Sequence, residues 1–519
     1  MQQYLNLGRI RVEILAGITV SLILVPEAVA FAFVAGVDPL VGLYAGFIVG
    51  LVTSLTGGRP GMISGATGAL AVAMVVLVKN HGVEYLFMTV ILMGIIQVGL
   101  GVLKQGQLIR MVPYPVMLGF VNGLAIVIFL AQLEHFKVET HDGGEQWLAG
   151  SALLIMIGLV VTTIAVIYLA QKLTSKFPSA LAGILVVSAI VIFGGVDTTT
   201  VGDFSSISGD LPTFGVPDVP MNFETLWIIL PYAFILAAIG LIESLLTSSL
   251  IDGITETKGQ NNRECMAQGA ANIITGFFGG MGGCATIGQS LINMKSGARL
   301  RISGTVAALL LLAYIVVASP LIELIPIAAL VGVMVFLVIG TFAWSSFRII
   351  RKIPVSDAFV IILVSAITVA TNLAVAVIIG VIVSALVFAW NAARSIYVVA
   401  EDENPEDGEQ SFRRTYTLHG QLFFASISSF RDLFNPVTDP NEVVIDFQYS
   451  RVWDHSGMEA IVELAQRYDR ADQQLHLLHL SANCQRILEK ANVIVDSDPG
   501  NDPSYRVTVS GVGGTDGGH

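Results

Sequence analysis

Two acidic side chains lie in the middle of long apolar stretches of this sequence, Glu27 in the first stretch and Glu243 near the centre of the chain. An ionised carboxyl group at the centre of a bilayer costs about 3 kcal/mol or more. Each should therefore face a cavity and either bind a cation or carry a proton. Thr247 lies one turn after Glu243, so a carboxylate and a hydroxyl share one helix face as oxygen ligands for a small cation. The alternative for either carboxyl is a protonated Glu that hydrogen-bonds a neighbouring helix.

Two glycine-rich segments, residues 57–68 and 279–290, interrupt the apolar sequence. Glycine and proline at this density weaken a continuous helix, while serine and threonine favour the start of a new one. The N-terminus of a half-helix carries unpaired N–H groups and about half a positive charge, so two that face each other form an anion site. We expect its residues to be Ser64, Gly65, Ala66, Thr67, Gly68, Ala285, Thr286 and Ile287.

The same glycines could instead serve only close helix packing, but that interpretation does not explain why the breaks recur at matched places. Thr67 and Thr286 would add hydroxyl contacts to the anion. If the coupling ion is Na⁺, its expected ligands are Glu243, Thr247 and Thr286.

The composition identifies a polytopic membrane protein. Of 519 residues, 54% are hydrophobic and only 13% are charged, whereas about a quarter of residues are charged in soluble domains. The net charge of -12 comes from loops and the last quarter of the chain and indicates no nucleic-acid binding. Cys265, Cys284 and Cys484 lack the spacing of a metal site or a disulfide framework, so we interpret them as unpaired structural thiols. We expect no cofactor other than the coupling ion.

The elements that must position these groups are membrane spans of about twenty apolar residues each. The two interrupted segments, roughly 62–78 and 284–294, bring the expected number to fourteen. The ordinary spans are predicted near residues 12–35, 38–56, 84–103, 113–133, 149–170, 178–194, 226–250, 265–279, 301–319, 325–345, 356–372 and 374–397.

The distribution of basic residues supports this number of spans. Lys and Arg near span ends accumulate on the cytoplasmic side. With both termini inside, every Lys and Arg of residues 1–398 falls inside except Lys79 and Lys137, and the acidic loops fall outside. This agreement holds only if both interrupted segments cross the membrane.

The external loop of residues 194–224 divides the spans into seven and seven, so the second half must be inverted relative to the first. Each break follows two full spans of its half. This spacing predicts an inverted repeat with substrate at the midplane. We assign residues 1–398 to a transport domain, with repeat 1 at about 10–196 and repeat 2 at about 224–398.

A small α/β domain is expected after the last span. Residues 399–411 form an acidic linker, residues 412–508 the domain, and residues 509–519 a disordered tail. Strands are predicted at 416–424, 443–447 and 475–480, and helices at 458–468 and 482–490. Asp454 and Ser456 precede the first helix, where amides could accept a phosphate on Ser456 in a regulatory step. The alternative is that one of them caps this helix.

At these motifs the chain resembles the SulP anion-transporter family, the sulfate permeases related to animal anion exchangers and cyanobacterial bicarbonate transporters. The C-terminal residues 418–424 and 454–457 resemble a STAS domain. The resemblance in the spans is carried by residues 25–32, 42–45, 63–68 and 243–247, and by Asn262, Arg263, Glu264, Gln268 and Gly269.

The resemblance implies core and gate domains, usually a homodimer, and an elevator motion of the core. The family's anion site lies between the third and tenth helices, here Ser64–Gly68 and Ala285–Ile287. In the bicarbonate transporters an acidic residue, typically Asp, and a threonine on the eighth helix help bind sodium, at the places of Glu243 and Thr247. Ser456 matches the serine that is phosphorylated in anti-sigma-factor antagonists.

Two departures from the family make the site less positive. Many members have Gln where this chain has Glu27, and the animal exchangers have Arg where a rough alignment places Gln289. Both departures weigh against chloride exchange and favour coupling to a proton or to sodium.

We therefore predict a transporter rather than an enzyme. It would import an inorganic oxyanion, sulfate or bicarbonate, with H⁺ or Na⁺, through a bacterial inner membrane whose lipids surround it. Dicarboxylate transport, chloride exchange, nucleobase transport on the same fold, and a sensor or scaffold acting through Ser456 are the alternatives. Sulfate's double charge exceeds the roughly single positive charge of two helix ends, which favours bicarbonate or a co-bound cation.

Overall fold

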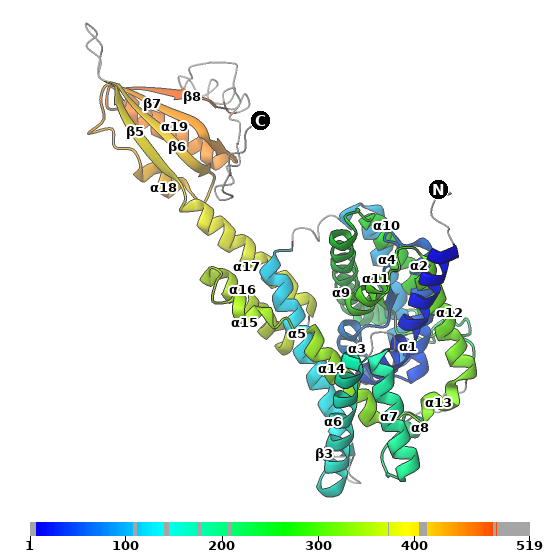
Figure 1. Cartoon of the computed structure of the whole chain (residues 1–519). Coiled ribbons are helices and arrows are strands. Elements are labelled where there is room, and N and C mark those ends of the chain that lie inside the picture. Colours follow the sequence, from blue (N-terminus) through cyan, green and yellow to red (C-terminus); the bar gives the residue numbers. More distant parts are fainter. Residues whose placement is uncertain are drawn as a thin grey trace. The chain divides into compact units, whose positions relative to one another are not determined.

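The computed structural model describes residues 7–106, 112–139, 145–173, 178–204, 209–371, 373–403, 413–480 and 484. The chain divides into two compact units, residues 1–381 and residues 382–519. The first is almost entirely helical, and the second contains a four-stranded sheet with helices (Figure 1).

Every predicted span corresponds to one helix. The long and medium helices are α1 (Leu7–Ala35), α2 (Pro39–Thr56), α3 (Gly68–His81), α4 (Val83–Val102), α5 (Tyr114–Gln132), α6 (Gly150–Leu173), α7 (Ser179–Gly194), α9 (Phe223–Thr255), α10 (Asn261–Phe277), α11 (Ile287–Lys295), α12 (Ile302–Val317), α14 (Ile327–Thr341), α16 (Val355–Ala370) and α17 (Leu373–Ala393). Short elements between them are η3 (Leu133–Phe136), β2 (Lys137–Glu139), β3 (Glu145–Trp147), α8 (Val201–Phe204), α13 (Ser319–Glu323) and α15 (Ser345–Ile349).

The length and apolar character of these helices suit a membrane protein. Within the described residues, eight helical segments are long and apolar enough to cross a bilayer, and α3, α7, α12 and α16 are shorter apolar helices. The other two predicted spans are α10, which carries many polar residues, and α11, which has only 9 residues. Fourteen crossings therefore remain a prediction.

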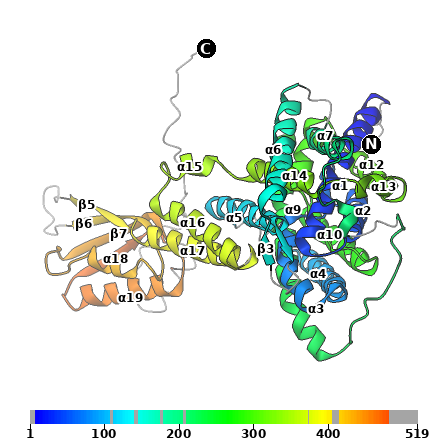
Figure 2. The ribbon, with the colours of Figure 1, turned by 90° about the horizontal axis from the view of Figure 1, so that it is seen from below.

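The helices of the first unit pack mainly as two groups, which we call the α1 group (α1–α4 and α9–α12) and the α5 group (α5–α7, α14 and α16). Helices from one half of the chain pack against helices from the other half. Helix α1 packs on α12 as α9 packs on α4, and α5 packs on α16 (Figure 2) as α6 packs on α14. An inverted repeat predicts this exchange, because each helix of one half has a counterpart in the other.

The two glycine-rich breaks meet each other inside the α1 group. Strand β1 (Ser64–Gly65) pairs antiparallel with β4 (Cys284–Ala285), with Ser64 opposite Ala285. The approach requires a glycine at residue 283, because a Cβ there would lie 2.3 Å from the carbonyl oxygen of Gly65. Helices α3 and α11 begin just after these strands.

The second unit is built on a sheet of order β5-β6-β7-β8, in which β5 and β6 are antiparallel and the other pairs are parallel. Buried apolar side chains such as Leu418, Ile445 and Ile461 join the sheet and helices into one core. Its elements are β5 (Tyr397–Glu403), β6 (Arg413–Leu422), α18 (Ile427–Asp432), β7 (Glu442–Val452), α19 (His455–Asp469) and β8 (Gln474–Leu478).

The start of the predicted linker was wrong, because residues 399–403 belong to β5. The charged side chains among these residues are not typical of a strand. In the structure, Glu403 of β5 nevertheless pairs with Arg413 of β6. The remainder of the linker, residues 404–411, lies outside the described residues. So do the tail at 509–519 and, apart from Cys484, the predicted helix at 482–490.

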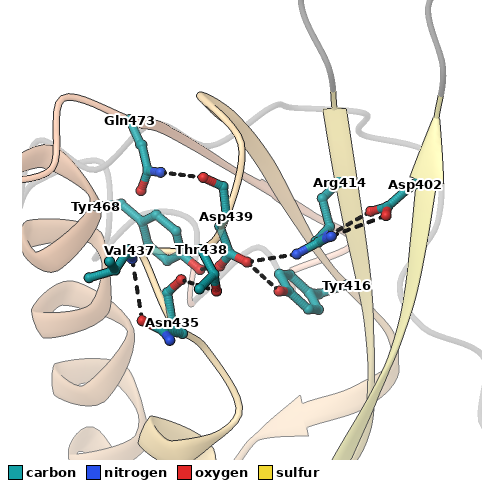
Figure 3. Close-up of polar contacts among 9 residues, drawn as sticks. All are labelled: Asp402, Arg414, Tyr416, Asn435, Val437, Thr438, Asp439, Tyr468 and Gln473. Carbon is teal, nitrogen blue, oxygen red and sulfur yellow. Dashed lines mark hydrogen bonds and ion pairs between the residues drawn. The ribbon is translucent and has the colours of Figure 1, made fainter.

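A buried carboxylate, Asp439, anchors the loop between α18 and β7 (Figure 3). It accepts hydrogen bonds from the hydroxyls of Tyr416 and Tyr468, both at 2.6 Å, and from Arg414 at 3.1 Å. Arg414 also bonds Asp402 of β5 and holds the pKa of that carboxyl below its usual value. Burial, with the hydrogen bond to Asp439, raises the pKa of Tyr416 to about 12. The network ties the loop to three elements of the domain.

Candidate functional site

Each break leads into a helix whose first residue is preceded by a threonine, Thr67 before α3 and Thr286 before α11. Neither threonine side chain caps its helix. The first turn of each helix closes at Ala71, whose amide bonds the Thr67 carbonyl at 3.0 Å, and at Ser290, whose amide bonds the Thr286 carbonyl at 3.2 Å. The amides before these positions have no partner within their helix, which is the usual condition of a helix N-terminus.

The pairing of β1 with β4 brings all eight predicted anion-binding residues into one place. The N-termini of α3 and α11 then lie where the two breaks meet, each with about half a positive charge. The basic side chain in the first break, Arg59, is buried and forms an ion pair with Asp252 at 3.2 Å. The positive charge of Arg59 is therefore already paired, and the predicted attraction for an anion would have to come from the backbone amides.

The hydroxyl groups near the amides contact other parts of the protein. Thr286 donates to the carbonyl oxygen of Ile63 at 3.2 Å, and the Thr67 hydroxyl lies 3.3 Å from the sulfur of Cys284. Ser64 accepts a hydrogen bond from Gln268 at 2.9 Å. These contacts orient the broken segments, and a direct hydroxyl contact with an anion stays a prediction.

The two helix ends differ in the space beside them. A Cβ at Gly288, in the first turn of α11, would meet no atom within 4 Å. A Cβ at Gly68, the first residue of α3, would lie 2.7 Å from Ile128 and 2.8 Å from Phe31. Gly288 therefore lies beside open space, while α1 and α5 cover the end of α3.

Glu243 lies beside the second break. Its carboxylate is 8% exposed and accepts a hydrogen bond from the thiol of Cys284 at 3.1 Å. The neighbouring Ser244 accepts from the amide of Ala285 at 3.1 Å, which holds α9 against β4. The sequence spacing of Cys284 indicates only a structural thiol, and only the folded chain places it against this carboxylate.

The three predicted sodium ligands have suitable donor chemistry. Thr247 donates its hydroxyl proton to the main-chain oxygen of Glu243 at 2.8 Å, and Thr286 donates to Ile63. Both hydroxyl oxygens therefore keep lone pairs for a cation, and the carboxylate of Glu243 adds negative charge, as Na⁺ prefers oxygen ligands. The sulfur of Cys284 is a softer donor that suits Na⁺ less well. In the described parts of the chain, no three His, Cys, Asp or Glu side chains cluster as metal ligands.

Glu27 also lies against the second break. The residue is 5% exposed, and its carboxylate accepts a hydrogen bond from the amide nitrogen of Gln289 on α11. Within the described residues neither Glu27 nor Glu243 forms an ion pair with a Lys or Arg. Both carboxyl groups thus meet the segment that carries the α11 amides.

The regulatory residues lie in the other unit. Asp454 caps α19, because it accepts hydrogen bonds from the amides of Gly457 and Phe424, each at 2.8 Å. The capping alternative therefore holds for Asp454. Ser456 is half-buried in the first turn of α19, and its phosphorylation stays a prediction.

Comparison with known proteins gives matches over nearly the whole chain. The model of the sulfate permease family matches residues 10–364, and that of the STAS domain matches residues 407–495. YbaR of Bacillus subtilis, provisionally named a sulfate transporter, is 44% identical over 93% of this chain and 97% of its own length. The bicarbonate transporter BicA of a Picosynechococcus species is 28% identical over 94% of this chain and 91% of BicA.

Two solved structures share the fold. The transmembrane domain of a cyanobacterial BicA superposes with a TM-score of 0.62 at 26% identity, covering 72% of this chain and 99% of that domain. The murine anion transporter Solute Carrier 26 family member A9 superposes with a TM-score of 0.77, covering 94% of this chain and 89% of that one. Its sequence identity is 16%, so this second likeness concerns the fold alone.

Proposed function

Because the chain belongs to the sulfate permease family and ends in a STAS domain, we propose that it imports sulfate or bicarbonate in symport with H⁺ or Na⁺. Its relatives are transporters rather than enzymes. The observation that carries the proposal is the pairing of β1 with β4, which brings two half-helix N-termini together.

The anion would bind the free amides at the start of α11, beside the open space at Gly288, with the start of α3 adding its partial positive charge. Main-chain amides bind oxyanions without a basic side chain. One bicarbonate then roughly balances the charge of the two helix ends, whereas sulfate exceeds it by one charge.

The coupling ion would bind at Glu243 or Glu27. Either carboxylate is negative unless it takes up a proton or contacts a cation, and both lie beside the segment that binds the anion. A site in which the coupling ion balances the charge of the anion has the same net charge as the empty site, whereas a site that holds the anion alone is more negative and costs more to move through the apolar interior. This is the physical basis of symport in the proposal.

The moving body would be the α1 group, which contains both breaks and both carboxylates. Its contacts with the α5 group are made mainly by α1 and α3, against α5, α7 and α14. An elevator motion would slide this interface while the site stays intact. We place both termini in the cytoplasm of a bacterial cell, with the protein as a homodimer in the plasma membrane.

Uptake by the purified protein in liposomes tests the proposal. Labelled sulfate and labelled bicarbonate are offered with Na⁺ and pH gradients imposed separately, and excess dicarboxylate, chloride, uracil or xanthine is added as a competitor. We expect one of the two oxyanions to accumulate with one of the two gradients. Accumulation of the anion that neither gradient increases, with no counter-anion inside, would refute symport. Inhibition by uracil or xanthine would indicate a nucleobase transporter.

A further inference from the structure

Helix α10 carries three buried polar side chains at intervals of four residues. Glu264, Gln268 and Asn272 are each at most 1% exposed. Residues four apart lie on one face of a helix, so the three form a line along α10 that we call the α10 ladder. Burial of three polar groups in one membrane helix is costly unless each finds a partner.

The first two members of the ladder hold the first break. Glu264 accepts a hydrogen bond from the amide of Gly58 at 2.7 Å and another from Gln268 at 2.9 Å. Gln268 also donates to the hydroxyl of Ser64 at 2.9 Å. The ladder thus contacts this break where it begins and again at β1.

The third member holds the second break. Asn272 accepts from the amide of Gly283 at 2.8 Å and donates to the carbonyl oxygen of the same residue at 3.0 Å. It also donates to Gln97 of α4 at 2.9 Å. Both main-chain groups of Gly283 are therefore satisfied by one side chain.

The contacts are made at equivalent places in the two breaks. Ser64 lies three residues before Thr67, and Gly283 lies three residues before Thr286. These threonines immediately precede α3 and α11. Helix α10 therefore contacts each break three residues before the threonine that precedes the half-helix.

We infer that Gln268 and Asn272 are positioning residues of the anion site, which they serve by fixing the separation of the two half-helix N-termini. The inference rests on the proposed function. Two residue pairs form a sheet too short to be stable alone, and irregular backbone within a membrane needs partners from the surrounding protein. The α10 ladder supplies those partners, so the amides of α3 and α11 are already placed before an anion arrives.

Asn272→Asp in the full-length protein tests the inference. The variant keeps the shape and the acceptor for the Gly283 amide but loses the donor to the Gly283 carbonyl and to Gln97. Asn122→Asp is a matched control, because Asn122 also accepts from a main-chain amide, that of Ala343, and donates to an oxygen, that of Ser346, each at 2.9 Å. Asn122 lies in the α5 group and is 5% exposed.

In liposomes, we expect Asn272→Asp to raise the KM for labelled sulfate or bicarbonate about tenfold, because the hydrogen bond that holds the Gly283 carbonyl is lost. The maximal rate should stay within about twofold, and Asn122→Asp should leave KM unchanged. Gln268→Ala should also raise KM. If Asn272→Asp does not fold, the KM of Gln268→Ala tests the inference. An unchanged KM in the folded variants, or an equal rise in Asn122→Asp, would overturn the inference.

Hydrogen exchange in detergent gives a readout that does not depend on transport. Asn272→Asp should speed exchange at residues 283–290, and Gln268→Ala should do so at residues 64–70, whereas the control should do neither. Faster exchange with an unchanged KM would mean that the ladder only stabilises the fold, contrary to the inference. If the wild type carries neither anion, the proposed substrate is wrong, and the exchange rates alone decide whether the ladder holds both breaks.

Discussion

Replacing Glu243 with Gln should uncouple anion transport from its driving ion. The substitution keeps the size of the side chain and removes the charge that a proton or cation would neutralise. Only Glu27 and Glu243 were predicted as intramembrane coupling groups, and both lie at the second break. If each carboxyl group takes up one ion, at most two coupling ions accompany each anion.

The expected magnitude follows from the gradient. One pH unit is worth about 1.36 kcal/mol for each proton, and a tenfold Na⁺ gradient supplies the same free energy. With the membrane potential clamped at zero, the wild type should accumulate the anion about tenfold if one carboxyl couples and about a hundredfold if both do. Glu243→Gln should lower this ratio by a factor of about ten for each unit of gradient.

The assay is steady-state accumulation in liposomes, compared with exchange of labelled for unlabelled anion at equal concentrations. The variant should retain exchange, because the amides that would bind the anion are unchanged. Glu13→Gln is the control. Glu13 is buried but accepts hydrogen bonds from the amides of Arg299, Leu300 and Ser303 before and at the start of α12, so its loss should lower stability and leave the ratio unchanged. Undiminished accumulation by Glu243→Gln would refute the assigned role of this carboxyl group.

Four further predictions follow from the site and the second unit. Gly288→Ala should fold normally, because the added Cβ meets no atom within 4 Å. It should raise the KM for the anion about tenfold by filling the space beside the amides. Gly68→Ala should instead reduce the yield of folded protein. Cys284→Ser replaces a soft donor with an oxygen and should increase stimulation of uptake by Na⁺ relative to H⁺, and an unaltered ion preference would argue against a cation site beside this residue. Asp439→Asn should lower the free energy of unfolding of the second unit by about 2 kcal/mol, measured by denaturation of the full-length protein. The pKa of Tyr416 is raised from 10.0 to about 12, so its contribution to stability is complete below pH 10 and is lost as the pH rises through about 12; Tyr416→Phe should make unfolding less dependent on pH in that interval.

The sequence alone determined the helical elements and the positions of the two breaks. Runs of apolar residues predict helices without reference to distant parts of the chain, because the bilayer requires each span to satisfy its own backbone. All fourteen predicted segments accordingly correspond to helices. The glycines of the two breaks and the isolated carboxyl groups of Glu27 and Glu243 likewise predict a site from local sequence. The charged end of β5 was missed because its pairing with Arg413 is not visible in local composition.

Only the tertiary structure decided which groups meet. Pairing of β1 with β4 joins residues more than two hundred positions apart, and no local pattern specifies it. The contacts of Glu243 with Cys284 and of Glu27 with Gln289 arise in the same way. Glu264 and Gln268 belong to the motif that resembles the family. Their contacts with the first break, and those of Asn272 with the second, are visible only in the folded chain. The physical reason is that hydropathy and helix-breaking residues act locally, whereas a hydrogen bond between buried polar groups depends on how the helices pack.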